Sequence, residues 1–176
     1  MTLPFNISNM AGVDYSLIFT PTTTSQLYGT SGTPNPPFAV GTLSDGSDGS
    51  KWVYVKYGTG GVTGIGYSVV FDEAFLAVMM SNSVGGLGDK IGIPTAAASS
   101  GDYGWVQVYG VCASIRVSAS AAANVALAST TTAGELDDSV ANPTKNITGI
   151  WLTTANGGSA GLAPGELNWP TVGSTN

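Results

Sequence analysis

Histidine is absent from this chain, and cysteine occurs once, at Cys112. Catalytic triads built on histidine, histidine-based zinc sites, cysteine-rich metal clusters and internal disulfides are therefore excluded. Charge is also scarce, because Asp, Glu, Lys and Arg together make up 9% of the 176 residues. A few carboxylates are all that remains for acid–base chemistry, so we expect a protein that is not an enzyme and that uses no cofactor or metal.

Cations are the scarcest of the charged residues. The net charge is −6, and the five cations are scattered along the chain, at Lys51, Lys56, Lys90, Arg116 and Lys145. Nucleic acids and anionic membranes are bound through clustered cations, so neither is an expected partner. The most apolar stretch, Val69 to Met80, contains Asp72 and Glu73 and falls short of the roughly 20 residues that span a bilayer. The first residues lack the cationic start of a secretory signal, so we expect synthesis in a cytoplasm.

Glycine, proline and small polar residues are abundant. The chain has 25 glycines and 9 prolines, and long helix formers never dominate a segment, which favours turn-rich β structure. The segment Lys51–Tyr57 alternates two sets of β-branched and aromatic side chains and lies between glycine-rich turns, so it predicts a strand. Strands that follow one another at intervals of roughly 8–12 residues are typical of a β-sandwich or a small β-barrel. The expected fold class is therefore all-β.

Further strands are predicted from the same kinds of pattern. The predicted segments are residues 62–71, 90–94, 104–110, 112–118, 118–128 and 147–153. Residues 72–80 fit either a short helix or a strand, because Ala74, Phe75, Val78 and Met79 suit one helical face while the flanks favour a strand. The last predicted strand surrounds Trp151, and the tail after it ends in a Gly-Glu-Leu-Asn-Trp-Pro sequence.

The first 50 residues have a different composition from the rest. Residues 20–49 hold four of the nine prolines and little apolar alternation. Pro34, Pro36 and Pro37 favour an extended or polyproline II path. We therefore divide the chain into an extended, Pro/Thr/Gly-rich N-terminal arm or loop region, residues 1–50, and a β-rich core domain, residues 51–176. A loop packed on its own domain is the alternative to a free arm.

Aromatic residues mark the candidate contact sites. Trp52, Trp105 and Trp151 lie within strand patterns and are expected in the core, whereas Trp169 follows Asn168 near the end of the chain and is a candidate for docking on a partner. Cys112 lies in an apolar strand, so we expect an inert buried thiol. The candidate interface residues are Tyr28, Pro34, Pro36, Pro37, Phe38 and Trp169.

The carboxylates form no recognisable catalytic pattern. Asp137 and Asp138 are neighbours, and adjacent side chains on a strand point to opposite faces. A glycosidase needs two carboxylates that face each other across roughly 5–9.5 Å. A hydrolase using Asp137 or Glu135 is therefore the weakest of the functional hypotheses. The segment around Asp45 and Asp48 lacks the spacing of a calcium loop and is typical of a turn.

The order of the motifs resembles one family of proteins. The chain runs from SDGSDGSKWVYVKYG at residues 44–58, through KIGIP, GWVQVYG, an alanine-rich segment and TTAGELDD, to ITGIWL and finally GELNWP at residues 165–170. This succession, over roughly residues 40–170, resembles the small virion structural proteins of tailed bacteriophages, and within them the capsid decoration (cement) type.

The resemblance implies a function without catalytic residues. Proteins of this type are β-rich, bind the assembled major capsid protein, commonly as homotrimers, and are found on the capsid surface of the virion. The resemblance thus implies a phage capsid decoration protein that stabilises the shell and has the major capsid protein and itself as partners. A tail or fibre component is a close alternative. A carbohydrate-binding module or adhesin is another, because exposed aromatics such as Trp169 and Tyr28 stack well on sugar rings.

Overall fold

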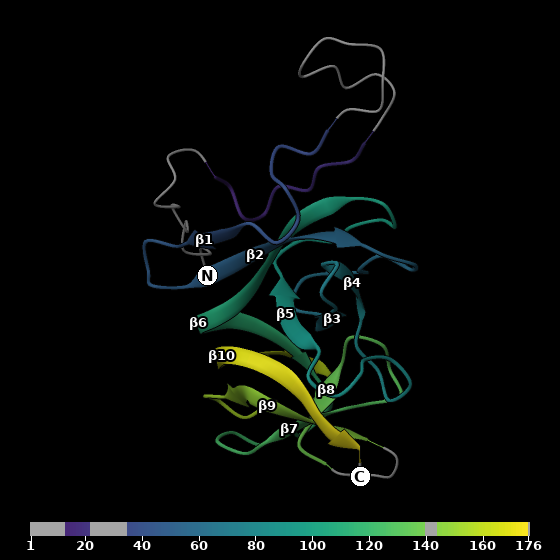
Figure 1. The fold of residues 1–176 in the computed structure, drawn as a ribbon. Coiled ribbons are helices and arrows are strands. Elements are labelled where there is room, and N and C mark those ends of the chain that lie inside the picture. The colour runs from purple at the N-terminus through teal and green to yellow at the C-terminus, as the bar shows by residue number, and fades with distance from the viewer. Residues whose placement is uncertain (1–12, 22–34, 140–143, 176) are drawn as a thin grey trace.

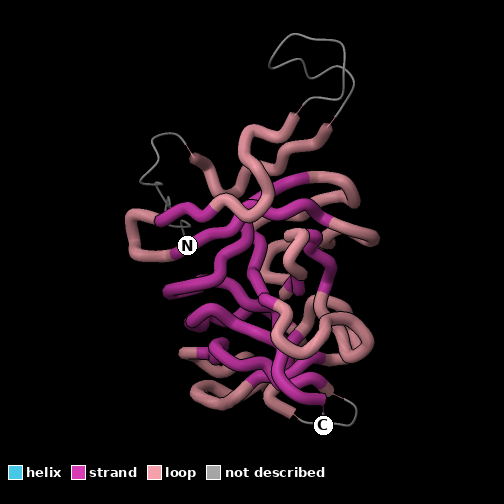
Figure 2. The backbone as a smooth tube through the Cα atoms, in the orientation of Figure 1, coloured by secondary structure: helices cyan, strands magenta, loops and turns pink. Residues whose placement is uncertain are grey.

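The computed structural model describes residues 13–21, 35–139 and 144–175, and this part of the chain consists of strands and loops without a helix (Figures 1 and 2). The all-β fold class predicted from the sequence is confirmed. The ten strands are β1 (Leu43–Asp45), β2 (Lys51–Tyr57), β3 (Val69–Phe71), β4 (Leu76–Met79), β5 (Lys90–Pro94), β6 (Tyr103–Val117), β7 (Leu127–Ser129), β8 (Leu136–Asp137), β9 (Lys145–Leu152) and β10 (Gly161–Thr175).

The strands form one sheet whose pairings close into two rings. In the first ring β2 pairs with β4, β4 with β3, β3 with β5, β5 with β6, and β6 again with β2. In the second, β6 pairs with β8, β8 with β7, β7 with β9, β9 with β10, and β10 with β6. The 15-residue strand β6 belongs to both rings, so it joins two small barrel-like units, one above the other in Figure 1.

Each ring encloses a hydrophobic core, and β3 and β5 lie between them. Val69 and Phe71 pack with Val55 and Val106 in the first core, whereas the intervening Val70 packs in the second. This division follows from strand geometry, because successive side chains point to opposite faces. The second core is the larger one and contains residues of β3, β5, β6, β7, β8, β9 and β10.

A third cluster lies on the outer face of β2 and β6, and it is aromatic. Trp52, Tyr54 and Trp105 point away from the first core and are nearly inaccessible to solvent. The described part of the N-terminal region covers them: the Tyr15 ring stacks on Trp52 with centroids 4.4 Å apart, and Phe38 lies edge-on to Trp105 at 5.2 Å. The described residues of the proposed arm therefore pack on the chain's own sheet, whereas the division at residue 50 stays a prediction.

Strand β2 has the bounds predicted from the sequence. Strand β9, residues 145–152, nearly matches the strand predicted over residues 147–153. The two strands predicted on either side of Val111 are one continuous strand, β6. Gly110 makes this possible by adopting a left-handed conformation, φ 91°, inside the strand. A β-carbon at this position would lie 3.1 Å from the Cα of Ser50, so the close approach also favours glycine.

Two strand predictions need correction. Residues 118–126 form turns rather than a strand, and only 127–129 become β7, because Ser120 and Asn124 have φ values of 63° and 59° that no strand tolerates. Of residues 62–71 only 69–71 form β3, since the segment between bends at Gly66 with φ 81°. The open alternative for residues 72–80 resolves in favour of the strand β4.

The sequence analysis missed β10, which matches β6 in length. Its prolines argue against a strand, because proline lacks the N–H that a ladder needs. In the structure Pro164 lies at the register shift between β10 and β6, and Pro170 lies at the shift between β10 and β9. These irregular positions, where regular pairing is interrupted, accommodate proline in the sheet.

Candidate functional site

The outward face of β6, β10 and β9 is the strongest candidate for a functional surface. Glu166 on β10 lies directly opposite Val111 of β6 and Trp151 of β9, and residues paired in this way share a face of the sheet. Val111 is 72% exposed, whereas the flanking Leu167 and Leu152 point into the second core. The three side chains therefore form one row that faces away from the core, and the expectation that Trp151 lies in the core is wrong.

Trp169 and Tyr109 extend this row. They are 43% and 37% exposed, and their ring centroids lie 6.4 Å apart. Trp169 has φ 50°, which is a rare conformation for a bulky residue. On the neighbouring strand, Gly149 approaches so closely that a β-carbon there would lie 2.5 Å from the carbonyl oxygen of Asn168. The outward bulge at Trp169 therefore depends on the positive φ of Trp169 in β10 and on the small size of Gly149 in β9.

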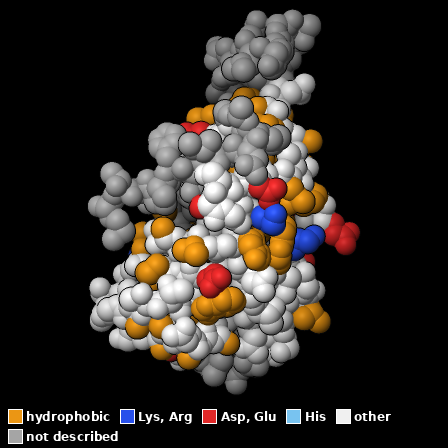
Figure 3. Space-filling model, turned by 90° about the vertical axis from the view of Figure 1, so that its left-hand side faces the viewer, with side chains coloured by type: hydrophobic (Ala, Val, Ile, Leu, Met, Phe, Trp, Pro, Cys, Tyr) orange, Lys and Arg blue, Asp and Glu red, His pale blue; other side chains and the backbone are white. Residues whose placement is uncertain are grey.

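We call this surface the Trp169 face and define it by five residues, Tyr109, Val111, Trp151, Glu166 and Trp169. Glu166 is its only charge. Its carboxylate is half-buried and has no hydrogen-bond or ion-pair partner among the described residues. Figure 3 shows one side of the molecule, where hydrophobic side chains are scattered among uncharged polar ones and charged side chains are few.

Polar groups border the Trp169 face on two sides. Lys51, which pairs with Tyr109 across β2 and β6, forms an ion pair with Asp45 at 2.5 Å. On the other side the hydroxyl groups of Thr148 and Thr171 are hydrogen-bonded at 2.8 Å. An exposed apolar centre with a polar border is the arrangement found in protein–protein interfaces, where aromatic residues are enriched and charged ones are depleted.

The three other predicted interface residues that the structure describes lie away from the Trp169 face. Tyr28 and Pro34 are outside the described residues. Phe38 is turned inward, because its ring contacts Tyr54 and Trp105 in the aromatic cluster. Pro37 is exposed, and Pro36 lines a surface hollow. Of the predicted residues that the structure describes, only Trp169 lies on the Trp169 face, and the interface role of all six residues stays a prediction.

The hollow beside Pro36 has a volume of about 540 Å³. Its described lining comes from two stretches of the N-terminal region, from β2, and from the start of β6 with the residues just before it. It consists of Thr20, Pro21, Asn35, Pro36, Lys56, Ser100, Gly101, Asp102 and Tyr103. The carboxylate of Asp102 accepts a hydrogen bond from the Ser99 backbone N–H at 2.7 Å. Lys56 lies 5.7 Å from the centre of the Tyr103 ring. The lining thus pairs one ammonium with one buried carboxylate that is already hydrogen-bonded.

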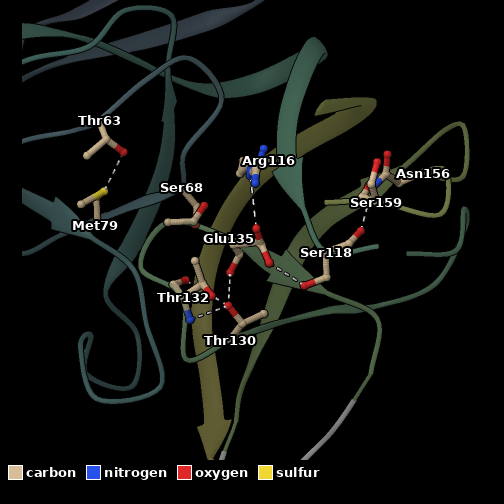
Figure 4. A network of polar contacts seen from close by, with 11 residues as sticks. Thr63, Ser68, Met79, Arg116, Ser118, Thr130, Thr132, Glu135, Asn156 and Ser159 are labelled. Carbon is tan, nitrogen blue, oxygen red and sulfur yellow. Dashed lines mark hydrogen bonds and ion pairs between the residues drawn. The ribbon is translucent and has the colours of Figure 1, made fainter. Parts of the chain in front are cut away.

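Glu135 has a structural setting. Its carboxylate accepts hydrogen bonds from Nε of Arg116 at 3.2 Å and from the Ser118 hydroxyl at 2.9 Å (Figure 4). Arg116 also lies 5.6 Å from the centre of the Tyr67 ring. Glu135 therefore faces a cation and a hydroxyl group rather than a second carboxylate, and the contacts connect the loop before β8 with β6.

Asp137 and Cys112 have environments that favour their uncharged forms. Burial, with a hydrogen bond to Asp138, raises the pKa of Asp137 above its ordinary value. Burial raises the pKa of Cys112 to about 11, so the prediction of a buried thiol is confirmed. In the part of the chain that the structure describes, no three His, Cys, Asp or Glu side chains gather as a metal site requires.

Sequence reasoning did not find Val111 and Glu166. Val111 is apolar like its buried neighbours, but it lies on the same side of β6 as Tyr109, opposite to the buried Val108 and Cys112, and no described segment covers it. Glu166 lies in a strand that the prolines concealed. The one usable signal was Trp169, whose position between a polar residue and a proline marked it as unusual.

Within residues 13–21, 35–139 and 144–175, there is no helix with the length and apolar character needed to cross a membrane. No family model matches the chain, and no match to a curated protein is found.

Proposed function

We propose that this chain is a structural protein of a bacteriophage virion that binds and stabilises the assembled capsid shell as a decoration (cement) protein. Its partners are the major capsid protein and further copies of itself in a homotrimer, and its location is the capsid surface after synthesis in the host cytoplasm. The observation that carries the proposal is the Trp169 face, an exposed aromatic and aliphatic surface with a single charge.

The arrangement of the motifs supports the same function. The segments on which the resemblance to decoration proteins rests coincide with β2, β5, β6, β8, β9 and β10, so they form the framework of both rings. The chain also has little charge to desolvate when surfaces come together, which favours tight packing among many copies. A shell with repeated sites further needs only modest affinity at each contact, because neighbouring contacts raise the effective concentration.

The test is to mix the purified protein with matured capsids that lack it and to image the particles. We expect density at regular lattice positions and a higher temperature of capsid disruption. Capsids that remain bare at saturating protein concentration would overturn the proposal. Density confined to the tail of complete virions would favour a tail or fibre component instead.

A carbohydrate-binding module is the second candidate. The observation that favours it is the pair of exposed rings at Trp169 and Tyr109, inclined by 37° to each other, since aromatic faces stack on pyranose rings. A glycan array is the direct test. Binding that disappears in Trp169→Ala would support this candidate, and an array without signal would remove it.

A further inference from the structure

We propose that the Trp169 face docks on an arginine of the capsid shell protein, with the carboxylate of Glu166 as the acceptor of its ion pair. This inference rests on the proposed function and adds to it the face that binds and the chemistry of the partner. The partner surface is expected to present one arginine within an apolar surround.

The position of Glu166 carries the first step. Its carboxylate lies between Val111 and Trp151, is half-buried, and has no partner among the described residues. The two ion pairs found among those residues join Lys51 to Asp45 and Arg116 to Glu135. A docked protein would remove the remaining water from Glu166, and an unpaired carboxylate is costly to bury. Docking on this face therefore requires a cation opposite Glu166.

The aromatic neighbours favour arginine over lysine. A guanidinium group binds a carboxylate through two parallel hydrogen bonds and stacks on an aromatic ring, and it is more weakly hydrated than an ammonium group. Trp151 lies directly across from Glu166, and Trp169 lies three residues further along β10. The face thus offers a carboxylate and indole rings side by side. A guanidinium group can bind the carboxylate with two hydrogen bonds and stack on a ring, whereas an ammonium group cannot make the paired hydrogen bonds or stack as a plane.

The backbone of Trp169 supports a binding role. A positive φ at a bulky residue is an unfavourable conformation that persists only where the surroundings impose it, and such positions cluster at functional sites. Here the ring is held outward before any partner arrives, with Tyr109 beside it. A side chain that is already ordered loses little conformational entropy on binding.

The experiment measures the protein concentration that half-saturates matured capsids lacking the protein. Wild type is compared with Glu166→Gln, which removes the charge but keeps the shape, and with Glu166→Lys, which reverses the charge. Leu87→Lys is the matched control, because Leu87 is 81% exposed in the loop between β4 and β5 and lies outside the Trp169 face.

We expect the half-saturating concentration to rise at least about tenfold for Glu166→Gln, to pass beyond detection for Glu166→Lys, and to stay unchanged for Leu87→Lys. Thermal unfolding of all three variants should match wild type, since Glu166 has no partner to lose among the described residues. Added salt should weaken binding of wild type more than binding of Glu166→Gln, because the ion pair is absent from the variant.

Trp169→Gly separates the ring from the charge. Glycine adopts the φ of 50° without strain, so this variant removes the indole and keeps the bulge. We expect it to bind capsids at least about tenfold more weakly, as is usual for an aromatic residue at the centre of an interface.

The outcomes distinguish the two proposals. If wild type binds and the Glu166 and Trp169 variants bind equally well, the docking inference is overturned and the capsid function stands. If wild type leaves the capsids bare, the proposed function fails and the inference fails with it. Loss of binding in Trp169→Gly alone would overturn the arginine assignment. Glycan binding that depends on Trp169, with capsid binding unaffected, would overturn the inference in favour of a carbohydrate ligand.

Discussion

The two halves of β6 have outer faces that are chemically similar and differ in what covers them. In the first half, Trp105 and its neighbours on β2 lie beneath Tyr15 and Phe38, so that an aromatic outer surface has become a third core. In the second half, Val111 and the adjacent Trp169 have no such cover among the described residues. Aromatic content alone therefore does not distinguish structural residues from interface residues.

The covering segment decides which role a face takes. Tyr15 is 3% exposed although it lies far before the first strand in the sequence, and Trp52 beneath it is 1% exposed. The described part of the N-terminal region thus contributes buried side chains to a third hydrophobic cluster, outside the core of the first ring. The Trp169 face keeps its aromatic residues accessible, and this difference makes the two faces respond in opposite ways to substitution.

The largest effect is expected from a chain that begins at residue 41. It lacks Tyr15 and Phe38, which leaves the aromatic cluster open to water, and we expect it to lose at least about 3–5 kcal/mol of unfolding free energy. Urea unfolding, monitored by tryptophan fluorescence, measures the loss of unfolding free energy. Tyr15→Ala in the full chain is a second way to expose the aromatic cluster. Leu17→Ala is the control, because Leu17 is 64% exposed. Unchanged stability of the shortened chain would show that the cover is dispensable.

The next effect depends on pH and concerns Tyr54 on the covered face. Burial, with the neighbouring Tyr103, raises the pKa of Tyr54 far above its ordinary value. Above about pH 10 the unfolded chain loses the phenolic proton while the folded chain keeps it, so stability falls as pH rises, by about 1.4 kcal/mol per pH unit for this group. Tyr54→Phe should remove that part of the slope.

At neutral pH the same variant should be as stable as wild type, because the Tyr54 hydroxyl has no hydrogen-bond partner among the described residues. Unfolding free energies between pH 8 and 11 or so, measured for both proteins, give the difference curve. Cys112 titrates with a raised pKa in both, so its contribution cancels. Parallel curves for the two proteins would contradict the prediction.

A smaller effect is expected for Tyr15→Phe. The Tyr15 hydroxyl is hydrogen-bonded to the hydroxyl of Ser44 at 2.7 Å, and the stacked ring remains in the variant. We expect a loss of about 1 kcal/mol, the usual net contribution of one such bond. Chemical denaturation of wild type and Tyr15→Phe measures the difference in unfolding free energy. A loss as large as that of Tyr15→Ala would mean that the ring itself shifts in the variant.

The smallest effect on stability is expected on the uncovered face. Trp169→Gly relieves a positive φ and removes only a half-exposed ring, so we expect the unfolding free energy to change by no more than about 0.5 kcal/mol. Differential scanning calorimetry is sufficient to measure it. A loss comparable to that of opening the aromatic cluster would show that both faces are structural and would end the contrast between them.

The sequence predicted the parts of the fold that depend on local pattern. The alternation of Lys51–Tyr57 is regular and is bounded by turns, so β2 was predicted with its observed bounds. Residues 118–128 alternate less clearly, and there the tertiary contacts decide: the backbone N–H of Ser120 donates to Gly157 O and that of Asn124 to Leu152 O, which holds the segment in turns. Such long-range partners are invisible to a local pattern.

The candidate site was harder to predict for a related reason. Its centre is formed where three strands distant in sequence meet, and the pairings of Glu166 with Val111 and Trp151 follow from register alone. Register in turn depends on the irregularities in the pairing of β10, one of which contains Trp169 and lies opposite Gly149. Trp169 could be singled out as a candidate because it lies between a polar residue and a proline near the end of the sequence. Its neighbours on the face are known only from the strand pairing.

The membership of β6 in both rings has a consequence for biosynthesis. The first ring has all its strands once Val117 has left the ribosome, but the second needs β10, which ends at Thr175. Until then β6 has an unpaired edge and the larger core lacks one of its walls, a state prone to pairing with other chains. Completion of the fold therefore waits for the synthesis of β10, and a chain truncated within this strand would aggregate rather than fold with a shorter strand.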